Sequence, residues 1–221
     1  MMDWMQILSL APMILALTIS VIGHEIAHAL SATMCGDSSA KEQNRLSINP
    51  IKHIDLVGTI IFPILLYVSQ TMAGVTHPML FGWAKPVPVN MRVVINNKGY
   101  LGAVFVSLAG IMYNLLLAFV ASLFIHFEPT NTIEIFAFNF LYYLIFINVI
   151  LMIFNLLPIP PLDGANALKY FLNYFGNKSV EMFFDKIEKF GMVILLIFLF
   201  TPLNGLLFRF IHKITMWFMV E

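Results

Sequence analysis

Long apolar stretches alternate with shorter polar segments along the whole chain. Four regular stretches, each near or above the roughly 18 apolar residues that a bilayer-spanning helix needs, are 7–34, 100–125, 135–157 and 191–208. A fifth, less regular stretch at 56–73 contains Gly58 and Pro63, which can bend a helix or let it re-enter a membrane where protein covers the freed backbone groups. The pattern predicts an all-α fold, a polytopic transmembrane helical bundle of about five to six membrane segments with one of them re-entrant.

The polar segments indicate how these stretches are oriented. Lys and Arg occur in segments 35–55, 74–99 and 169–189 and are missing from the turn at 126–134. Because short basic loops stay on the cytoplasmic side, we expect the three basic segments in the cytoplasm and the turn outside. This arrangement requires a re-entrant excursion between residues 56 and 84. It also places the ends of the first and third regular stretches on the same side.

Segment 169–189 interleaves apolar and charged residues at helical spacing. This pattern is typical of an amphipathic helix at the membrane interface, and equally of a solvated surface helix.

Composition supports an integral membrane protein. Of the 221 residues, 60% are hydrophobic and 11% are charged, whereas an average soluble domain carries about 25% charged residues. Twelve basic residues balance twelve acidic ones, which argues against nucleic acid as a partner. The lone Cys35 excludes a disulfide within the chain and any multi-cysteine metal site. Asp3 and the lack of basic residues before the first apolar stretch favour its retention in the mature protein.

The first apolar stretch contains the sequence His-Glu-Ile-Ala-His at 24–28. Residues four apart share a face of a helix, so His24 and His28 can bind one metal ion. Glu25 lies beside them and can accept a proton from water that the metal activates. The alternative is a set of buried polar residues that hydrogen-bond neighbouring spans. That alternative carries a free-energy cost of roughly 2.5–3.5 kcal/mol for each charged group at mid-bilayer, so we favour the metal site.

A catalytic zinc needs a third protein ligand, and Asp163 is the candidate. It ends the segment NLLPIPPLDG at 155–164, in which three prolines within four positions must break the helix. Broken helices are tolerated at membrane depth where they line a cavity or pack in protein. The alternative is an ordinary helix exit followed by a turn. The distribution of basic residues places this end on the same side as His28, which favours the ligand.

These motifs resemble the site-2 protease family of intramembrane zinc metalloproteases. The segment SLAGIMYNLLLA is similar to the family's Ala-Gly-Pro-x-x-Asn motif, and NPIKHIDLVGTIIFPILL and FGWAKPVPVN resemble its compact bacterial branch, which lacks an appended PDZ or CBS domain. The resemblance runs from about Ile14 to Gly164, and the remaining quarter of the chain carries little family signal. One departure is Ile111 in place of the motif's proline, which calls the helix geometry around Asn114 into question.

The resemblance implies that His24, His28 and Asp163 bind Zn²⁺ and that Glu25 is the general base. It further implies that the protein hydrolyses peptide bonds within or next to transmembrane segments of other membrane proteins, in the bacterial cytoplasmic membrane. The distribution of basic residues predicts that the active site opens toward the cytoplasm. We expect a single integral membrane domain over residues 1–221. Its core motifs would lie within 14–164, and residues 165–221 would add amphipathic and membrane segments. The oligomeric state is left open.

Four further residues are candidates for catalysis or substrate binding. By resemblance, Asn114 would lie near the active site and stabilise an oxyanion, and Asn155 would be the polar residue of the third core span, near the substrate. Pro86 and Pro88 suit an exposed extended edge, where Val87 and Val89 could receive an unwound substrate by strand addition. A plain loop is the alternative for this segment.

Several alternatives remain open at this point. His53 and Asp55 could support the metal ligands or form a lid, or could be a polar interfacial turn. For the whole protein, the alternatives are a catalytically silent homologue that binds transmembrane helices or metal, and a metal transporter. The intact Glu25 argues against the silent homologue, because a binding protein needs no base. A single tight site beside a general base favours hydrolysis over transport.

Overall fold

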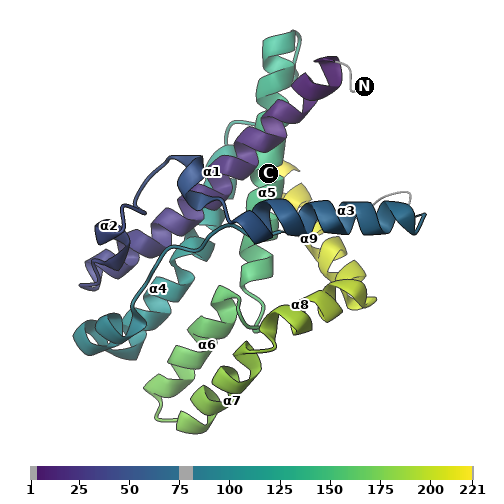
Figure 1. The fold of residues 1–221 in the computed structure, drawn as a ribbon. Coiled ribbons are helices and arrows are strands. Elements are labelled where there is room, and N and C mark those ends of the chain that lie inside the picture. Colours follow the sequence, from purple (N-terminus) through teal and green to yellow (C-terminus); the bar gives the residue numbers. More distant parts are fainter. Residues whose placement is uncertain (1–3, 75–81, 221) are drawn as a thin grey trace.

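The fold is a helical bundle, seen in a computed structural model that describes residues 4–74 and 82–220 (Figure 1). Every regular element in these two ranges is a helix, so the predicted all-α class is confirmed. The helices that pack most closely on one another are α1 (Trp4–Met34), α4 (Met91–Ser122), α5 (Thr132–Asn155) and α6 (Asp163–Tyr174).

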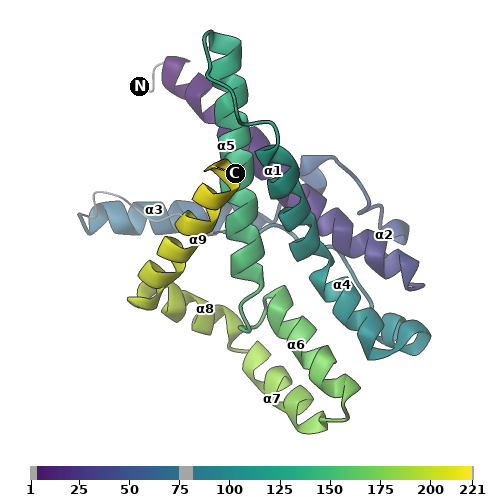
Figure 2. The same cartoon turned by 180° about the vertical axis from the view of Figure 1, so that it is seen from behind.

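Shorter helices surround this central group. They are α2 (Ser39–Glu42), η1 (Pro50–His53), η2 (Leu56–Ile61), α3 (Phe62–Met72), α7 (Lys178–Glu188), α8 (Gly191–Phe200) and α9 (Leu203–Val220). Helix α3 projects sideways from α1 and runs across the direction of α5 in both views (Figures 1 and 2). Helix α7 packs beside α6, and α9 reaches back to α5.

The number of membrane spans is lower than the sequence predicts. In the described ranges three helices, α1, α4 and α5, are long and apolar enough to cross a bilayer, and α8 with α9 adds a fourth only if the pair is one span. The expected five to six segments were therefore wrong. Two reasons are visible: the apolar helix Leu56–Met72 is too short, and the expected span 191–208 divides near Pro202, where the chain bends by 81°. Residues 75–81 of the expected excursion lie outside the described ranges.

Local sequence signals explain where the two central spans begin. Helix α4 starts at Met91, earlier than expected, because the Asn90 side chain accepts hydrogen bonds from the N–H groups of the first turn. Gly99 then adopts a φ of +69° and interrupts the helix, so the expected span beginning at residue 100 corresponds to the part after this break. Helix α5 is capped by Asn131, whose side chain accepts from the Glu134 N–H.

Small residues allow the central helices to pack closely. Ala16 of α1 and Ala118 of α4 are fully buried, together with Ile145 and Val149 of α5. Small side chains let helix backbones approach, which is the main source of packing between membrane helices. Large apolar side chains are exposed on the outer faces of the same helices, as expected of a surface in contact with lipid.

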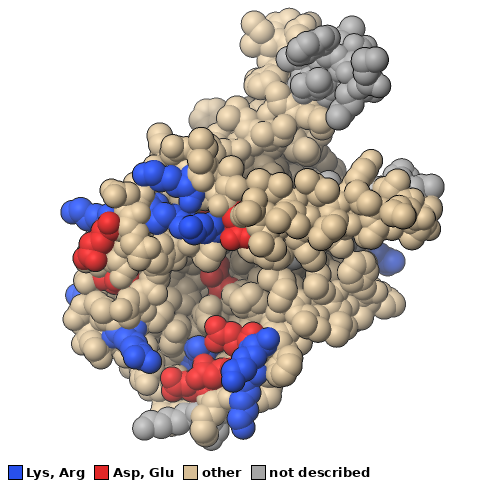
Figure 3. All heavy atoms as spheres, viewed as in Figure 1, with Lys and Arg blue, Asp and Glu red and all other residues tan. Residues whose placement is uncertain are grey.

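Charged side chains gather at one end of the bundle. In Figure 3 they cover the region of α2, the start of α4, and α7, while the upper part of the same view is almost free of them. The connection between α4 and α5 lies at the opposite end from α6 and α7 (Figures 1 and 2). On the face shown in Figure 3, charged side chains therefore gather toward the end that holds α2 and α7.

Candidate active site

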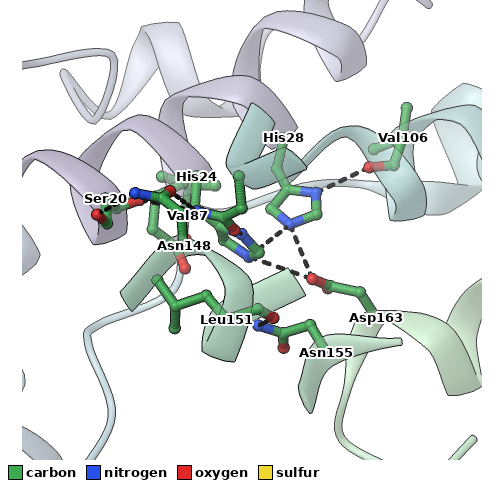
Figure 4. Close-up of polar contacts among 11 residues, drawn as sticks. Ser20, His24, His28, Val87, Val106, Asn148, Leu151, Asn155 and Asp163 are labelled. Atoms are coloured by element: carbon green, nitrogen blue, oxygen red, sulfur yellow. Dashed lines mark hydrogen bonds and ion pairs between the residues drawn. The ribbon is translucent and has the colours of Figure 1, made fainter. Parts of the chain in front are cut away.

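Three polar side chains from distant parts of the sequence converge between α1 and the start of α6 (Figure 4). His24 and His28 lie one turn apart on α1, and Asp163 is the first residue of α6. The distances from His24 Nε2 to His28 Nε2, from His24 Nε2 to Asp163 Oδ2, and from His28 Nε2 to Asp163 Oδ2 are each 3.2 Å. Among the described residues this is the one group of His, Cys, Asp or Glu side chains arranged to hold a metal ion.

The spacing of these atoms fits a tetrahedral zinc ion. Zinc bonds of about 2.0–2.1 Å in tetrahedral geometry place neighbouring ligand atoms roughly 3.3 Å apart. His24 Nδ1 lies 2.6 Å from Asn114 Oδ1, and His28 Nδ1 lies 2.8 Å from the Val106 carbonyl oxygen. Because both partners are acceptors, each Nδ1 carries a proton, and in the neutral imidazole each Nε2 then presents a lone pair. Two lone pairs and a carboxylate then face one point, an arrangement that a cation stabilises.

Asp163 reaches the histidines because the chain turns sharply after α5. The proline-rich segment ends one helix and lets α6 start at Asp163, in the first turn, where the helix dipole favours a negative charge. Gly164 makes the turn compact, since a Cβ there would lie 2.3 Å from the Leu156 carbonyl oxygen. The sequence motif therefore places the carboxylate by both its prolines and its glycine.

Gly110 of α4 packs directly against the two imidazoles. A Cβ at this position would lie 2.4 Å from His24 Cε1 and 2.5 Å from His28 Nε2. No side chain fits there, so the site depends on a glycine that sequence reasoning did not single out. The available signal was its position in SLAGIMYN, four residues before Asn114.

Glu25 directly follows His24 in the sequence but is not one of the three candidate ligands. Its carboxylate oxygen Oε2 accepts a hydrogen bond of 2.8 Å from the Val87 N–H. Pro86 and Pro88 have no N–H, so Val87 supplies the single backbone donor within residues 86–88. Segment 83–90, which has no helix or strand, therefore holds the carboxylate of Glu25 through its main chain.

Contacts from the first third of the chain fix segment 83–90. Arg45 Nη2 donates to the Lys85 carbonyl oxygen at 2.8 Å, and Asp37 Oδ2 accepts from the Asn90 N–H at 2.6 Å. Burial raises the pKa of Asp37, but hydrogen bonds from Ser39 and Asn90 outweigh it, so the net pKa is lowered. The segment next to Glu25 is thus anchored at both ends by charged side chains.

The remaining predicted site residues lie around this centre. Asn114 is fully buried and faces His24 with its oxygen. Asn155 is the last residue of α5 and lies near Asp163 (Figure 4), with its Nδ2 donating to the Leu151 carbonyl oxygen. The side chain of Val87 is buried and that of Val89 is partly buried. No contact described here tests a role in substrate binding for Asn155, Val87 or Val89.

His53 and Asp55 lie outside the cluster. His53 is buried with its Nε2 2.8 Å from the Ser47 carbonyl oxygen, and the Asp55 carboxylate accepts from the Gly58 N–H at the start of η2. Ile111, which replaces the expected proline, sits within continuous helix and is buried. The side chain of Asn114 reaches His24 despite this departure.

Comparisons with known proteins agree with this geometry. A model of Peptidase family M50 matches residues 12–199, which extends beyond the motif region ending at Gly164. The chain is 36% identical over 205 residues to "Putative zinc metalloprotease YwhC" of Bacillus subtilis, covering 90% of this chain and 84% of that protein. It is 26% identical over 197 residues to "Putative zinc metalloprotease Rip2" of Mycolicibacterium smegmatis, covering 88% of this chain and 68% of that protein. No solved structure matches the chain. On this evidence the chain belongs to peptidase family M50, the site-2 protease family.

Proposed function

We propose that this protein is an intramembrane zinc endopeptidase that hydrolyses peptide bonds within or next to transmembrane segments of other membrane proteins, as in regulated intramembrane proteolysis. The observation that carries the proposal is the convergence of His24 Nε2, His28 Nε2 and Asp163 Oδ2 to 3.2 Å from one another. Membership of family M50 and the apolar helices that carry the site support it further.

Each side chain has a distinct task in this proposal. His24, His28 and Asp163 hold zinc, which when bound polarises the scissile carbonyl and lowers the pKa of water toward about 7. Glu25 takes the proton of the attacking water and delivers it to the departing amine. The Val87 N–H keeps the Glu25 carboxylate at a fixed position beside the ligands. A substrate helix must unwind first, because its peptide bonds are enclosed by hydrogen bonds and side chains.

An apolar cavity lies on the side of α1 that carries Glu25. Its volume is about 450 Å³, and Val21 and Leu17, one and two turns before Glu25, form part of its wall. Trp83 and Ala84 of segment 83–90 also line it. A cavity of this size accommodates apolar side chains of a transmembrane substrate. Because the Val87 N–H is engaged by Glu25, the Val87 carbonyl oxygen and the backbone of Val89 are our candidates for pairing with the unwound substrate.

We further propose that the protein lies in the bacterial cytoplasmic membrane with its active site toward the cytoplasm. Charged residues gather at the end of the bundle near the site, and the turn without Lys or Arg lies at the other end. Short basic segments remain on the cytoplasmic side.

Single cysteines on a Cys35→Ala background test this orientation. Positions Gln43, Asn96 and Asn177 are exposed at the charged end, so cysteines there should resist a membrane-impermeant thiol reagent in intact cells and react after permeabilisation. A cysteine at Thr130, in the turn at the other end, should react in intact cells. Labelling of position 96 but not of 130 in intact cells would reverse the orientation.

Substitution of Glu25 tests the hydrolytic mechanism. Glu25→Gln removes a base without removing a ligand, so the purified variant should bind about one zinc and lose cleavage of a model transmembrane substrate. Metal content by elemental analysis and product by mass spectrometry provide the two measurements. Full cleavage by this variant would exclude the mechanism.

Ligand variants provide the matched contrast. His24→Ala, His28→Ala and Asp163→Ala should each lose zinc as well as cleavage, because each removes one of three ligands. Zinc binding without any cleavage by the native protein would favour the silent homologue, and zinc flux through native-protein vesicles would favour the transporter.

A further inference from the structure

A buried chain of hydrogen bonds leads from His24 into the centre of the bundle. Beyond the contact between His24 and Asn114, Asn114 Nδ2 donates to Asn148 Oδ1 at 2.7 Å. Asn148 Nδ2 in turn donates to Ser20 Oγ at 2.7 Å, and Figure 4 shows Ser20 and Asn148 near His24. Ser20, Asn114 and Asn148 have 0% exposure and belong to α1, α4 and α5. This series of hydrogen bonds therefore connects the three central helices to one candidate zinc ligand.

At the far end of this series of hydrogen bonds, the orientation of the Asn148 amide is fixed by its neighbours. The amide nitrogen of Asn148 also donates to the Leu144 carbonyl oxygen at 2.7 Å, and the Ser20 hydroxyl donates to the Ala16 carbonyl oxygen at 2.7 Å. If the Asn148 amide were flipped, its oxygen would face a carbonyl oxygen that can only accept. Asn148 must therefore present its oxygen to Asn114.

The orientation of Asn148 in turn determines the orientation of the Asn114 amide and the tautomer of His24. Asn114 directs its nitrogen toward Asn148 Oδ1 and the Ser20 carbonyl oxygen, at 2.7 and 3.4 Å. Its oxygen is then left to face His24 Nδ1, which must carry the proton. The proton on Nδ1 leaves the lone pair on Nε2, the atom that faces Asp163 and His28.

We propose that Asn148 and Ser20 are positioning residues that act through Asn114 to fix the tautomer of His24 and thereby raise the affinity of the site for zinc. The proposal rests on the role of His24 as a zinc ligand in the proposed function. It also changes the expectation for Asn114, because the amide nitrogen is engaged away from the cluster and is not available to an oxyanion.

Zinc titration of purified variants tests the proposal without any need for a substrate. Asn148→Leu keeps the approximate size of the side chain but removes the acceptor that orients Asn114. We expect about 10- to 100-fold weaker zinc binding, measured by competition with a fluorescent chelator. Ser20→Ala removes one of two acceptors for the Asn148 nitrogen, so its loss should be in the same direction and smaller.

A spectroscopic readout separates a tautomer effect from a merely structural one. In zinc-free protein with ¹⁵N-labelled histidine, His24 should show a protonated Nδ1 in the native chain and a mixture of tautomers in Asn148→Leu. Thr215→Val on α9 is the matched control, because Thr215 is equally buried and its hydroxyl bonds only its own helix, to Ile211 at 2.9 Å. The control should leave both measurements unchanged.

Native zinc affinity together with a native His24 spectrum in folded Asn148→Leu would overturn the proposal. If that variant does not fold, the same two native results in Ser20→Ala would overturn it. Failure of the proposed function is recognised separately, because in that case the native protein itself would bind no zinc.

Discussion

His24 and His28 occupy equivalent positions on one face of α1, yet the protein supports them by different means. His24 donates to the side chain of Asn114, which belongs to a network of side chains crossing three helices. His28 donates to the main-chain oxygen of Val106. Both partners belong to α4, so one helix orients both imidazoles. The orientation of His24 can therefore be changed by substituting side chains, while that of His28 depends on where the backbone of α4 lies.

A shift of the α4 backbone should weaken the hydrogen bonds that orient both imidazoles. Gly110→Ala is the substitution expected to cause such a shift. The added methyl group would lie within 2.6 Å of atoms of both imidazoles, so α4 or the rings must shift. Overpacking of this kind costs roughly 1–3 kcal/mol, or about 5- to 150-fold in zinc affinity if it falls on the bound state. Competition with a fluorescent chelator measures the change.

Gly205→Ala on α9 is the control for this prediction. A Cβ at Gly205 would meet no atom of another residue within 4 Å, so zinc affinity should stay at the native value. Equal affinities for the two alanine variants would show that close packing at Gly110 does not control the site.

Shortening the side chain of Val106 should destabilise the fold and leave zinc binding unchanged. Val106→Ala removes fully buried methyl groups and should lower the free energy of unfolding by roughly 1–3 kcal/mol. The carbonyl oxygen that orients His28 remains, so zinc affinity should be native, in contrast to Asn148→Leu. A loss of zinc affinity as large as that of Asn148→Leu would remove the distinction between the two histidines.

The contrast also explains what could be predicted from the sequence. The pair His24 and His28 is visible because helical spacing alone places them on one face, and Asp163 because prolines mark a broken helix. Gly110 and Asn148 act through residues that are distant in sequence, and the partner of His28 is a main-chain atom that any residue supplies. These contacts depend on how helices pack, which no local pattern specifies.

The fold shows the same division between local and tertiary signals. The spans corresponding to α1 and α5 follow from apolar length, and their ends agree with the expectation to within a few residues. Pro202 marks a break between two helices that the length of the apolar stretch did not reveal, because apolar residues continue on both sides of it. The number of spans was overestimated for this reason and because 56–72 is short.

The bond between Glu25 and the Val87 N–H limits what a conventional mutational scan can reveal. Alanine at position 87 would retain the donor, as would every other residue except proline, so the scan would report only the loss of packing. Val87→Pro is the one natural substitution that deletes the donor, and it would extend an existing Pro-x-Pro segment in which φ is already restricted. An engineer who wishes to change the surroundings of Glu25 must therefore edit the main chain.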